Sequence, residues 1–183
     1  QVSVEGKMVE VSDGASCADA LKEGLSGKRF KAAIACKAGD TLLDLTAPVP
    51  TTTETLTLTP VTADTPEGLG LIRHSAAHVM AAAVKKLFPA AKVTIYDFDV
   101  ETPFSPDQFE AIEAEMQRII DAAVPFERMD ISKADAVKLF NDMGEPYKVE
   151  LIEGLEDGTI TLYRNGDFVD LCRGPHIPNA GFV

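Results

Sequence analysis

Segments with the pattern of β-strands recur through the first 62 positions of the chain. Apolar and polar residues alternate over residues 2–11, around a turn that contains glycine, and over residues 54–61, whereas residues 31–45 form two largely apolar runs around Ala38-Gly39-Asp40. A period of two is typical of strands with one buried face. Between these segments, Ser16 and Asp19 have the spacing of a capping box and predict the start of a short helix. The order of the elements predicts a mixed sheet with one helix across its face.

Beyond this region the apolar residues recur with the period of a helix. A polar segment rich in proline and glycine separates the two patterns and predicts a boundary between domains at 1–62 and 63–183. A long amphipathic helix is predicted over residues 70–87, and its end is marked by a proline. A second helix is predicted to begin at Ser105, and a third to end at Gly144.

The last part of the chain returns to the pattern of strands. We expect strands over residues 147–155, 159–166 and 168–172, with turn sequences between them. Asp157-Gly158 and Asn165-Gly166 have the sequence of tight turns. The second predicted domain therefore combines long helices with an antiparallel sheet, and the predicted fold class of the whole chain is α+β.

Charge and composition narrow the range of functions. The formal net charge of -12 means that the surface as a whole repels nucleic acid, and the one basic cluster, residues 26–31, is interpreted as a solvated loop. No apolar run approaches the roughly 18 residues of a membrane span and no signal-peptide pattern opens the chain, so we expect a cytoplasmic protein. The scattered cysteines Cys17, Cys36 and Cys172 favour reduced thiols over a disulfide framework.

The histidines His74, His78 and His176 are the only three in the chain, and each lies in a motif. The first two are four residues apart in "RHSAAHVM", which places both on one face of the predicted helix. The third follows Cys172 in "DLCRGPH". Three imidazoles and one thiol are a set of ligands that zinc binds tetrahedrally. The alternative is that His74 and His78 pack in the core with satisfied nitrogens and that Cys172 is a small buried hydrophobic residue, but because no histidine lies elsewhere we favour a shared functional site.

Two further polar residues are predicted to lie near this site. Asp170 precedes Cys172 by two residues on the same side of a predicted strand, and Lys148 is placed on a strand from which it can face inward. The Gly174-Pro175 pair predicts a rigid bend that directs the thiol and the third imidazole into one concavity. A lysine, a carboxylate, a thiol and imidazoles can activate water and bind an amine, which is the equipment of a hydrolase.

Four stretches resemble the amino-terminal editing domain of bacterial threonyl-tRNA synthetases. They are "GLIRHSAAHVMAAAVKKLFP", "YDFDVETPFSPDQFEAIEAEM", "PYKVELI" and "FVDLCRGPHIPN". Residues 1–62 are similar to the TGS domain, a ubiquitin-like β-grasp unit that precedes the editing domain in that family. The likeness runs in order through essentially the whole chain, and the pairing of HxxxH with "DLCRGPH" is highly specific.

The resemblance implies a small β-grasp domain at 1–62 followed by an α+β editing domain at 63–183. It also implies an excised fragment of a class II aminoacyl-tRNA ligase, without the aminoacylation core and the anticodon-binding domain. One departure from the family concerns the segment before "YDFD". Family members carry a glycine-rich loop of roughly ten residues there, of a length common for functional loops, whereas here Ile95 runs straight into Tyr96.

The activity implied by the resemblance is aminoacyl-tRNA deacylation, the hydrolysis of the seryl ester of mischarged Ser-tRNA(Thr). A pocket built for threonine cannot strongly reject serine, because one missing methyl group changes binding by only about 1–3 kcal/mol. A second pocket can instead exclude threonine by its size and remove the serine. The expected partners are the acceptor end of tRNA(Thr) carrying serine and the rest of the synthetase, with no membrane involved.

The resemblance also assigns catalytic roles to five residues. His74 and Lys148 match family positions that hold and activate the attacking water. His78, Cys172 and His176 match the rest of the catalytic pocket. These roles are expectations carried over from the family and do not follow from spacing alone.

Tyr96 and Asp170 match family positions that read the seryl group, and Asp170 is expected to pair with the ammonium of the substrate. We expect no metal, because Lys148 offers a base that a zinc enzyme does not need. One alternative is a zinc-dependent deacylase of the alanyl-tRNA synthetase type, in which the three histidines and Cys172 bind the metal. The other is a non-catalytic TGS-type module that binds a ligand or RNA.

Overall fold

The computed structural model describes residues 1–94 and 97–183. Packing divides the chain into two compact units, and each is composed of segments that are not all contiguous in sequence. Unit 1 contains residues 1–75, 174–178 and 182–183, and unit 2 contains residues 76–173 and 179–181. Both units combine helices with sheets that are largely antiparallel, as the sequence predicts.

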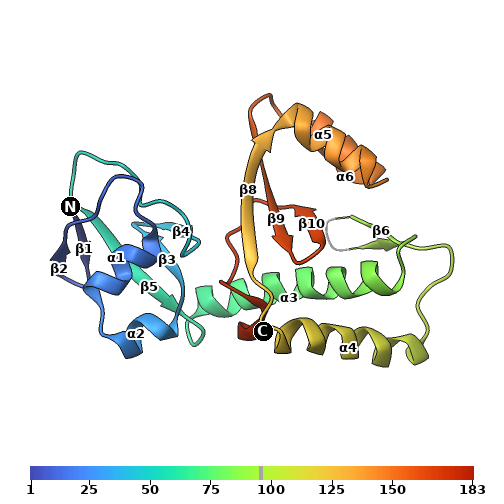
Figure 1. Ribbon diagram of the computed structural model, residues 1–183, viewed down its shortest axis with the longest axis horizontal. Helices are drawn as coiled ribbons and strands as arrows, with labels where there is room; N and C mark the ends of the chain where they lie inside the picture. Colours follow the sequence, from blue (N-terminus) through green and yellow to red (C-terminus); the bar gives the residue numbers. More distant parts are fainter. Residues whose placement is uncertain (95–96) are drawn as a thin grey trace. The chain divides into compact units, whose positions relative to one another are not determined.

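A five-stranded mixed sheet forms the centre of unit 1 (Figure 1). The predicted strand segments form its strands, which are β1 (Val2–Val4), β2 (Lys7–Val9), β3 (Ala33–Ala38), β4 (Thr41–Leu43) and β5 (Leu56–Thr62). The strand order is β2-β1-β5-β3-β4; β1 and β5 run parallel, and the other neighbours run antiparallel. The predicted mixed sheet and its first hairpin are therefore confirmed.

Helix α1 (Cys17–Gly24) packs against β1, β2 and β5. The predicted capping box starts it: the Ser16 hydroxyl accepts from the Asp19 backbone N–H at 3.1 Å, and the Asp19 carboxylate accepts from the Ser16 N–H at 3.0 Å. These bonds satisfy backbone donors that have no partner within a first helical turn. The buried face of α1 includes Leu21, which completes a core with Val4 of β1.

The basic cluster of unit 1 is a short helix, so the predicted loop at residues 26–31 is wrong. Helix α2 spans Gly27–Ala32 and has no buried residue. Ser26 occupies the capping position with extended backbone angles, and the chain turns into the helix directly after it. A serine before a glycine marks a turn in many sequences, but here it marks a helix start.

Helix α3 (Pro66–Leu87) begins four residues before the start that the sequence predicts. Its first turn uses part of the segment that was expected to be a linker. The Thr65 hydroxyl accepts from the Gly68 N–H at 3.0 Å, and Pro66 needs no partner for its nitrogen at the first helical position. A side chain at Gly68 would meet the Thr62 carbonyl oxygen at 2.0 Å, so only glycine fits here.

Unit 2 contains a three-stranded antiparallel sheet in the order β10-β9-β8, and the two helices α5 and α6 pack on it (Figure 1). These elements are β8 (Phe126–Ser132), α5 (Lys133–Asp142), α6 (Pro146–Glu153), β9 (Thr159–Asn165) and β10 (Phe168–Leu171). The hairpin of β9 and β10 and the helix end near Gly144 are confirmed. The sequence did not predict β8.

The predicted strand at 147–155 is wrong, because most of that segment forms α6. Alternation of Tyr147 and Leu151 with polar residues suggested a strand, but both side chains are more than a third exposed. The residues of α6 that face the interior are Lys148 and Ile152, which are four positions apart and therefore share one helical face. The strand pattern was a coincidence within a helical one.

A second core of unit 2 lies where α4 (Pro106–Asp121) packs with the C-terminal half of α3. It includes Val84 and Ile112, and the two short strands β6 (Lys92–Val93) and β7 (Phe98–Asp99) pair beside it. The predicted capping of α4 by Ser105 is present. Among the described helices, none has the length and apolar character needed to cross a membrane.

Candidate active site

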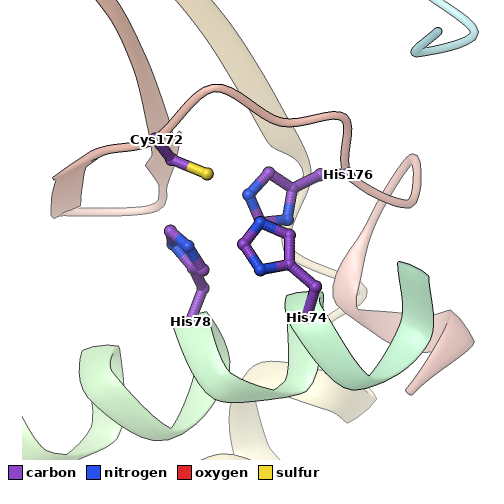
Figure 2. Close-up of side chains that lie close together, drawn as sticks. All are labelled: His74, His78, Cys172 and His176. Carbon is purple, nitrogen blue, oxygen red and sulfur yellow. The ribbon is translucent and has the colours of Figure 1, made fainter. Parts of the chain in front are cut away.

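Four residues from two distant parts of the sequence come together at one point. His74 and His78 lie one turn apart on α3, and Cys172 and His176 lie just after β10. One ligand atom from each of the four lies within 4.8 Å of the others. Figure 2 shows the His78 ring and the Cys172 sulfur directed toward each other, with the other two rings beside them.

His176 is held by two hydrogen bonds to buried groups, and a third joins one of these groups to the next residue. Its backbone N–H donates to the Asp44 carboxylate at 2.8 Å. Its Nδ1 lies 2.9 Å from the Ser75 hydroxyl, which also accepts from the Ile177 N–H at 3.3 Å. Asp44, Ser75 and His176 are each at most 5% exposed. Both the main chain and the ring of His176 are therefore fixed.

The His74 ring stacks on the His176 ring, with centroids 4.5 Å apart and an angle of 22° between the planes. Burial lowers the pKa of His74, because the charged imidazolium loses hydration. At neutral pH His74 is therefore a neutral imidazole, which has one nitrogen able to accept a proton.

His78 lies in a different environment one turn further along α3. Its Nδ1 is 3.9 Å from the Asp170 carboxylate, a distance that allows attraction but not a direct hydrogen bond. The rings of Phe126 and Phe168 approach it edge-on, with centroids 6.5 and 6.4 Å from its own. Aromatic rings on two sides limit the orientation of this imidazole.

Lys148 and Asp170 form a buried ion pair. Lys148 Nζ lies 2.6 Å from Asp170 Oδ1 and donates to the Thr94 carbonyl at 3.0 Å. The same Asp170 oxygen accepts from the Leu171 N–H at 2.8 Å. Burial raises the pKa of Asp170, and the attraction of the Lys148 ammonium opposes that rise. Asp170 is thus paired with Lys148 of the same chain. Lys148 reaches Asp170 from helix α6 instead of from the predicted strand.

Lys148 and Asp170 also line a cavity of about 520 Å³ within unit 2. Apolar side chains such as Val93, Phe140 and Phe168 form much of its wall. A cavity with apolar walls and a few polar groups is typical of small-ligand sites. The remaining predicted site residue, Tyr96, lies outside the described residues.

Sequence reasoning missed Ser75 and Asp44. Ser75 carried a signal, because a serine between two histidines in the middle of an apolar helix needs a hydrogen-bond partner. Asp44 carried none, since it lies 132 positions before His176 and follows an ordinary strand.

The chain is similar to known proteins that act on tRNA. A family model described as the threonyl and alanyl tRNA synthetase second additional domain matches residues 160–183. The chain is 62% identical over 191 residues to the threonine–tRNA ligase of Nitratidesulfovibrio vulgaris strain DP4 and 61% identical over 192 residues to that of Oleidesulfovibrio alaskensis. The corresponding ligase of Solidesulfovibrio magneticus is 48% identical over 193 residues.

The chain is similar to the amino-terminal part of threonine–tRNA ligases. Each of these three alignments covers the whole chain but only 29% to 30% of the relative. The chain thus spans about 30% of the length of the curated relatives that it matches. The resemblance to threonyl-tRNA synthetases drawn from the motifs is confirmed, and the family model includes Cys172 and His176 of the site.

Proposed function

We propose that the chain is the editing region of a threonyl-tRNA synthetase and hydrolyses the seryl ester of Ser-tRNA(Thr). The observation that carries the proposal is the cluster of His74, His78, Cys172 and His176, in a chain similar throughout to threonine–tRNA ligases. In this proposal residues 1–62 are a β-grasp TGS domain and residues 63–183 are the editing domain. The partners are the acceptor end of tRNA(Thr) and the remainder of the synthetase.

Hydrolysis of an ester requires a proton acceptor for water and a positive group for the carbonyl oxygen. We assign the first role to His74, whose lowered pKa leaves it neutral and able to take the proton. We assign the second to Lys148, which is paired with a carboxylate and therefore carries a positive charge. This assignment differs from the sequence expectation that Lys148 is a base, because an ammonium that already donates two hydrogen bonds has no lone pair to offer.

The proposed step conserves all atoms and charges. Water adds through its oxygen to the ester carbonyl carbon while His74 accepts one of its protons. The carbonyl oxygen becomes negative, and the Lys148 ammonium stabilises it. The bond from carbon to the ribose oxygen then breaks, and the proton returns from His74 to that oxygen. The products are serine and uncharged tRNA(Thr).

Zinc is the alternative centre for the same residues. Three histidines and one cysteine within 4.8 Å are a ligand set that fits zinc, which would supply Lewis-acid chemistry and a bound water. Catalytic zinc sites keep one position open for that water, whereas four protein ligands would fill a tetrahedral site. The proposal therefore favours direct catalysis by the side chains.

The decisive experiment compares deacylation of Ser-tRNA(Thr) and Thr-tRNA(Thr) by the purified chain, with its zinc content determined in parallel. The proposal expects faster hydrolysis of the seryl ester, in both untreated and chelator-treated protein. Loss of activity on chelation, restored by zinc, would support the alanyl-type zinc deacylase. Binding of tRNA with no hydrolysis of either ester would support a non-catalytic module.

A further inference from the structure

Ser75 lies between the two histidines of α3 in sequence, and its hydroxyl contacts the third histidine. We propose that Ser75 and Asp44 are positioning residues that hold His176 in the tautomer with its proton on Nε2. His176 then offers a hydrogen-bond donor to an oxygen atom in the cluster. The use of that donor in hydrolysis rests on the proposed function, whereas the tautomer does not.

The tautomer follows from the hydrogen-bond partners of one hydroxyl. Among the described residues, Ser75 Oγ has two partners, the Ile177 N–H at 3.3 Å and His176 Nδ1 at 2.9 Å. The backbone N–H can only donate, so it uses one lone pair of the hydroxyl. The single hydroxyl hydrogen then has His176 Nδ1 as its acceptor. If Nδ1 carried a proton instead, the hydroxyl hydrogen would be buried without an acceptor, because Ser75 is 0% exposed.

Asp44 fixes the main chain of the same residue. Its carboxylate accepts from the His176 N–H at 2.8 Å, and a hydrogen bond to a charged acceptor is stronger than one between neutral groups. One residue therefore holds the backbone of His176 and the other holds its ring. The contact of Nδ1 with the Ser75 hydroxyl opposes a flip of the ring that would exchange its two nitrogens.

As a consequence, the stacked imidazoles of His74 and His176 have different roles. A neutral imidazole with an accepting Nδ1 carries its proton on Nε2, which is then a hydrogen-bond donor. Figure 2 shows one ring nitrogen of His176 turned toward Cys172. His176 then donates a hydrogen bond to a water or carbonyl oxygen, and His74 remains the proton acceptor. The same tautomer lacks a lone pair at Nε2, so zinc could bind there only if the Ser75 hydroxyl reversed its direction.

Nitrogen NMR of the full chain tests this inference without any tRNA. The chain is labelled with ¹⁵N-histidine, treated with a chelator and recorded at neutral pH by long-range ¹H–¹⁵N correlation, which distinguishes protonated from bare ring nitrogens. With only three histidines, single His→Gln variants assign every signal. We expect His176 to show a protonated Nε2 and a bare Nδ1. A protonated Nδ1 with a bare Nε2 would overturn the proposal.

Variants extend the test. Ser75→Ala should give His176 signals from both tautomers and lower the deacylation rate by roughly tenfold, the order expected for one hydrogen bond. Asp44→Asn keeps an acceptor and should retain the tautomer and most of the rate, whereas Asp44→Ala should lose part of both. Ser132→Ala removes a helix-capping hydroxyl of α5 and is the matched control, with no expected change at His176.

The outcomes separate the inference from the proposed function. A His176 signal in Ser75→Ala that is identical to the wild type would overturn the positioning role, whatever the enzymatic rate. If the wild-type chain shows the expected tautomer but hydrolyses no aminoacyl-tRNA, the positioning role stands and the proposed function fails.

Discussion

The two histidines of α3 lie one helical turn apart and have contrasting surroundings. His74 stacks on the imidazole of His176, whose Nδ1 contacts the hydroxyl of Ser75. His78 faces the ion pair of Lys148 and Asp170. One amphipathic helix can therefore present two identical side chains for different tasks, because the partners are supplied by other segments. His74 is suited to accept a proton, because its pKa is lowered, whereas His78 lies 3.9 Å from a carboxylate.

Of the two surroundings, the ion pair of Lys148 and Asp170 near His78 should be the more sensitive to mutation. Lys148→Ala leaves Asp170 buried without its partner, which costs about 3–5 kcal/mol of unfolding free energy and lowers Ser-tRNA(Thr) deacylation by about 10²-fold or more. Urea unfolding and single-turnover deacylation measure the two effects. The double variant Lys148→Met, Asp170→Leu should recover much of the stability but not the rate, since hydrophobic pairs often replace buried ion pairs without loss.

Lys85→Ala is a suitable control for that variant. Lys85 also pairs with a buried carboxylate, that of Glu145, at 2.6 Å. Its loss should reduce stability while leaving most of the deacylation rate. If Lys148→Ala kept the full rate, the positive charge for the carbonyl oxygen would have to come from elsewhere.

The neutral state of His74 should be visible in the pH dependence of the unfolding free energy. The pKa of His74 is lower in the folded chain than the value of about 6.5 for an unperturbed histidine. The unfolded chain therefore binds more protons as the pH falls below about 6.5, and the stabilising contribution of the neutral ring is lost in that direction. Unfolding free energies measured from pH 7.5 down to pH 5 should fall more steeply for the wild type than for His74→Gln.

The same change tests the role of His74 in catalysis. His74→Gln should lower deacylation by about 10²-fold, and the acid limb of the wild-type rate profile should lie below about 6.5. A variant with an unaltered acid limb would show that another group accepts the proton.

A smaller effect is expected from a change at Cys172 than from changes at Lys148 or His74. If its sulfur forms the wall that excludes the extra methyl of threonine, Cys172→Ala should raise hydrolysis of Thr-tRNA(Thr) relative to Ser-tRNA(Thr) by up to about tenfold. Competition assays with both charged tRNAs give the ratio. Cys36→Ala, which removes a buried thiol from the core of unit 1, is the control and should leave the ratio unchanged.

The smallest effect is expected far from the cluster. Ser16→Ala removes the capping box of α1 and should reduce the unfolding free energy by about 1 kcal/mol with no change in deacylation by the folded chain. Thermal unfolding and a rate assay at low temperature separate the two. A fall in rate in the folded variant would mean that α1 has a role beyond the stability of its unit.

The sequence predicted correctly those elements that are determined by neighbouring residues, such as helix caps and hairpin turns. The capping residues of α1 and α4 and the hairpin of β9 and β10 were read from neighbouring residues, and the structure contains them. Helix α6 was missed because its burial depends on the sheet beneath it, which alternation of Tyr147 and Leu151 does not reveal. The ion pair of Lys148 and Asp170 depends on the same packing and was missed for the same reason.

Helix α3 also restricts how the length of this chain can change. Each residue in a helix turns by about 100° and rises by about 1.5 Å, so His74 and His78 point the same way only because three residues lie between them. Insertion or deletion of one residue among positions 75–77 would rotate one imidazole away from the other. Substitutions at the exposed Met80 of the same helix carry no such penalty. The spacing of the two histidines therefore makes this part of the helix intolerant of insertions and deletions.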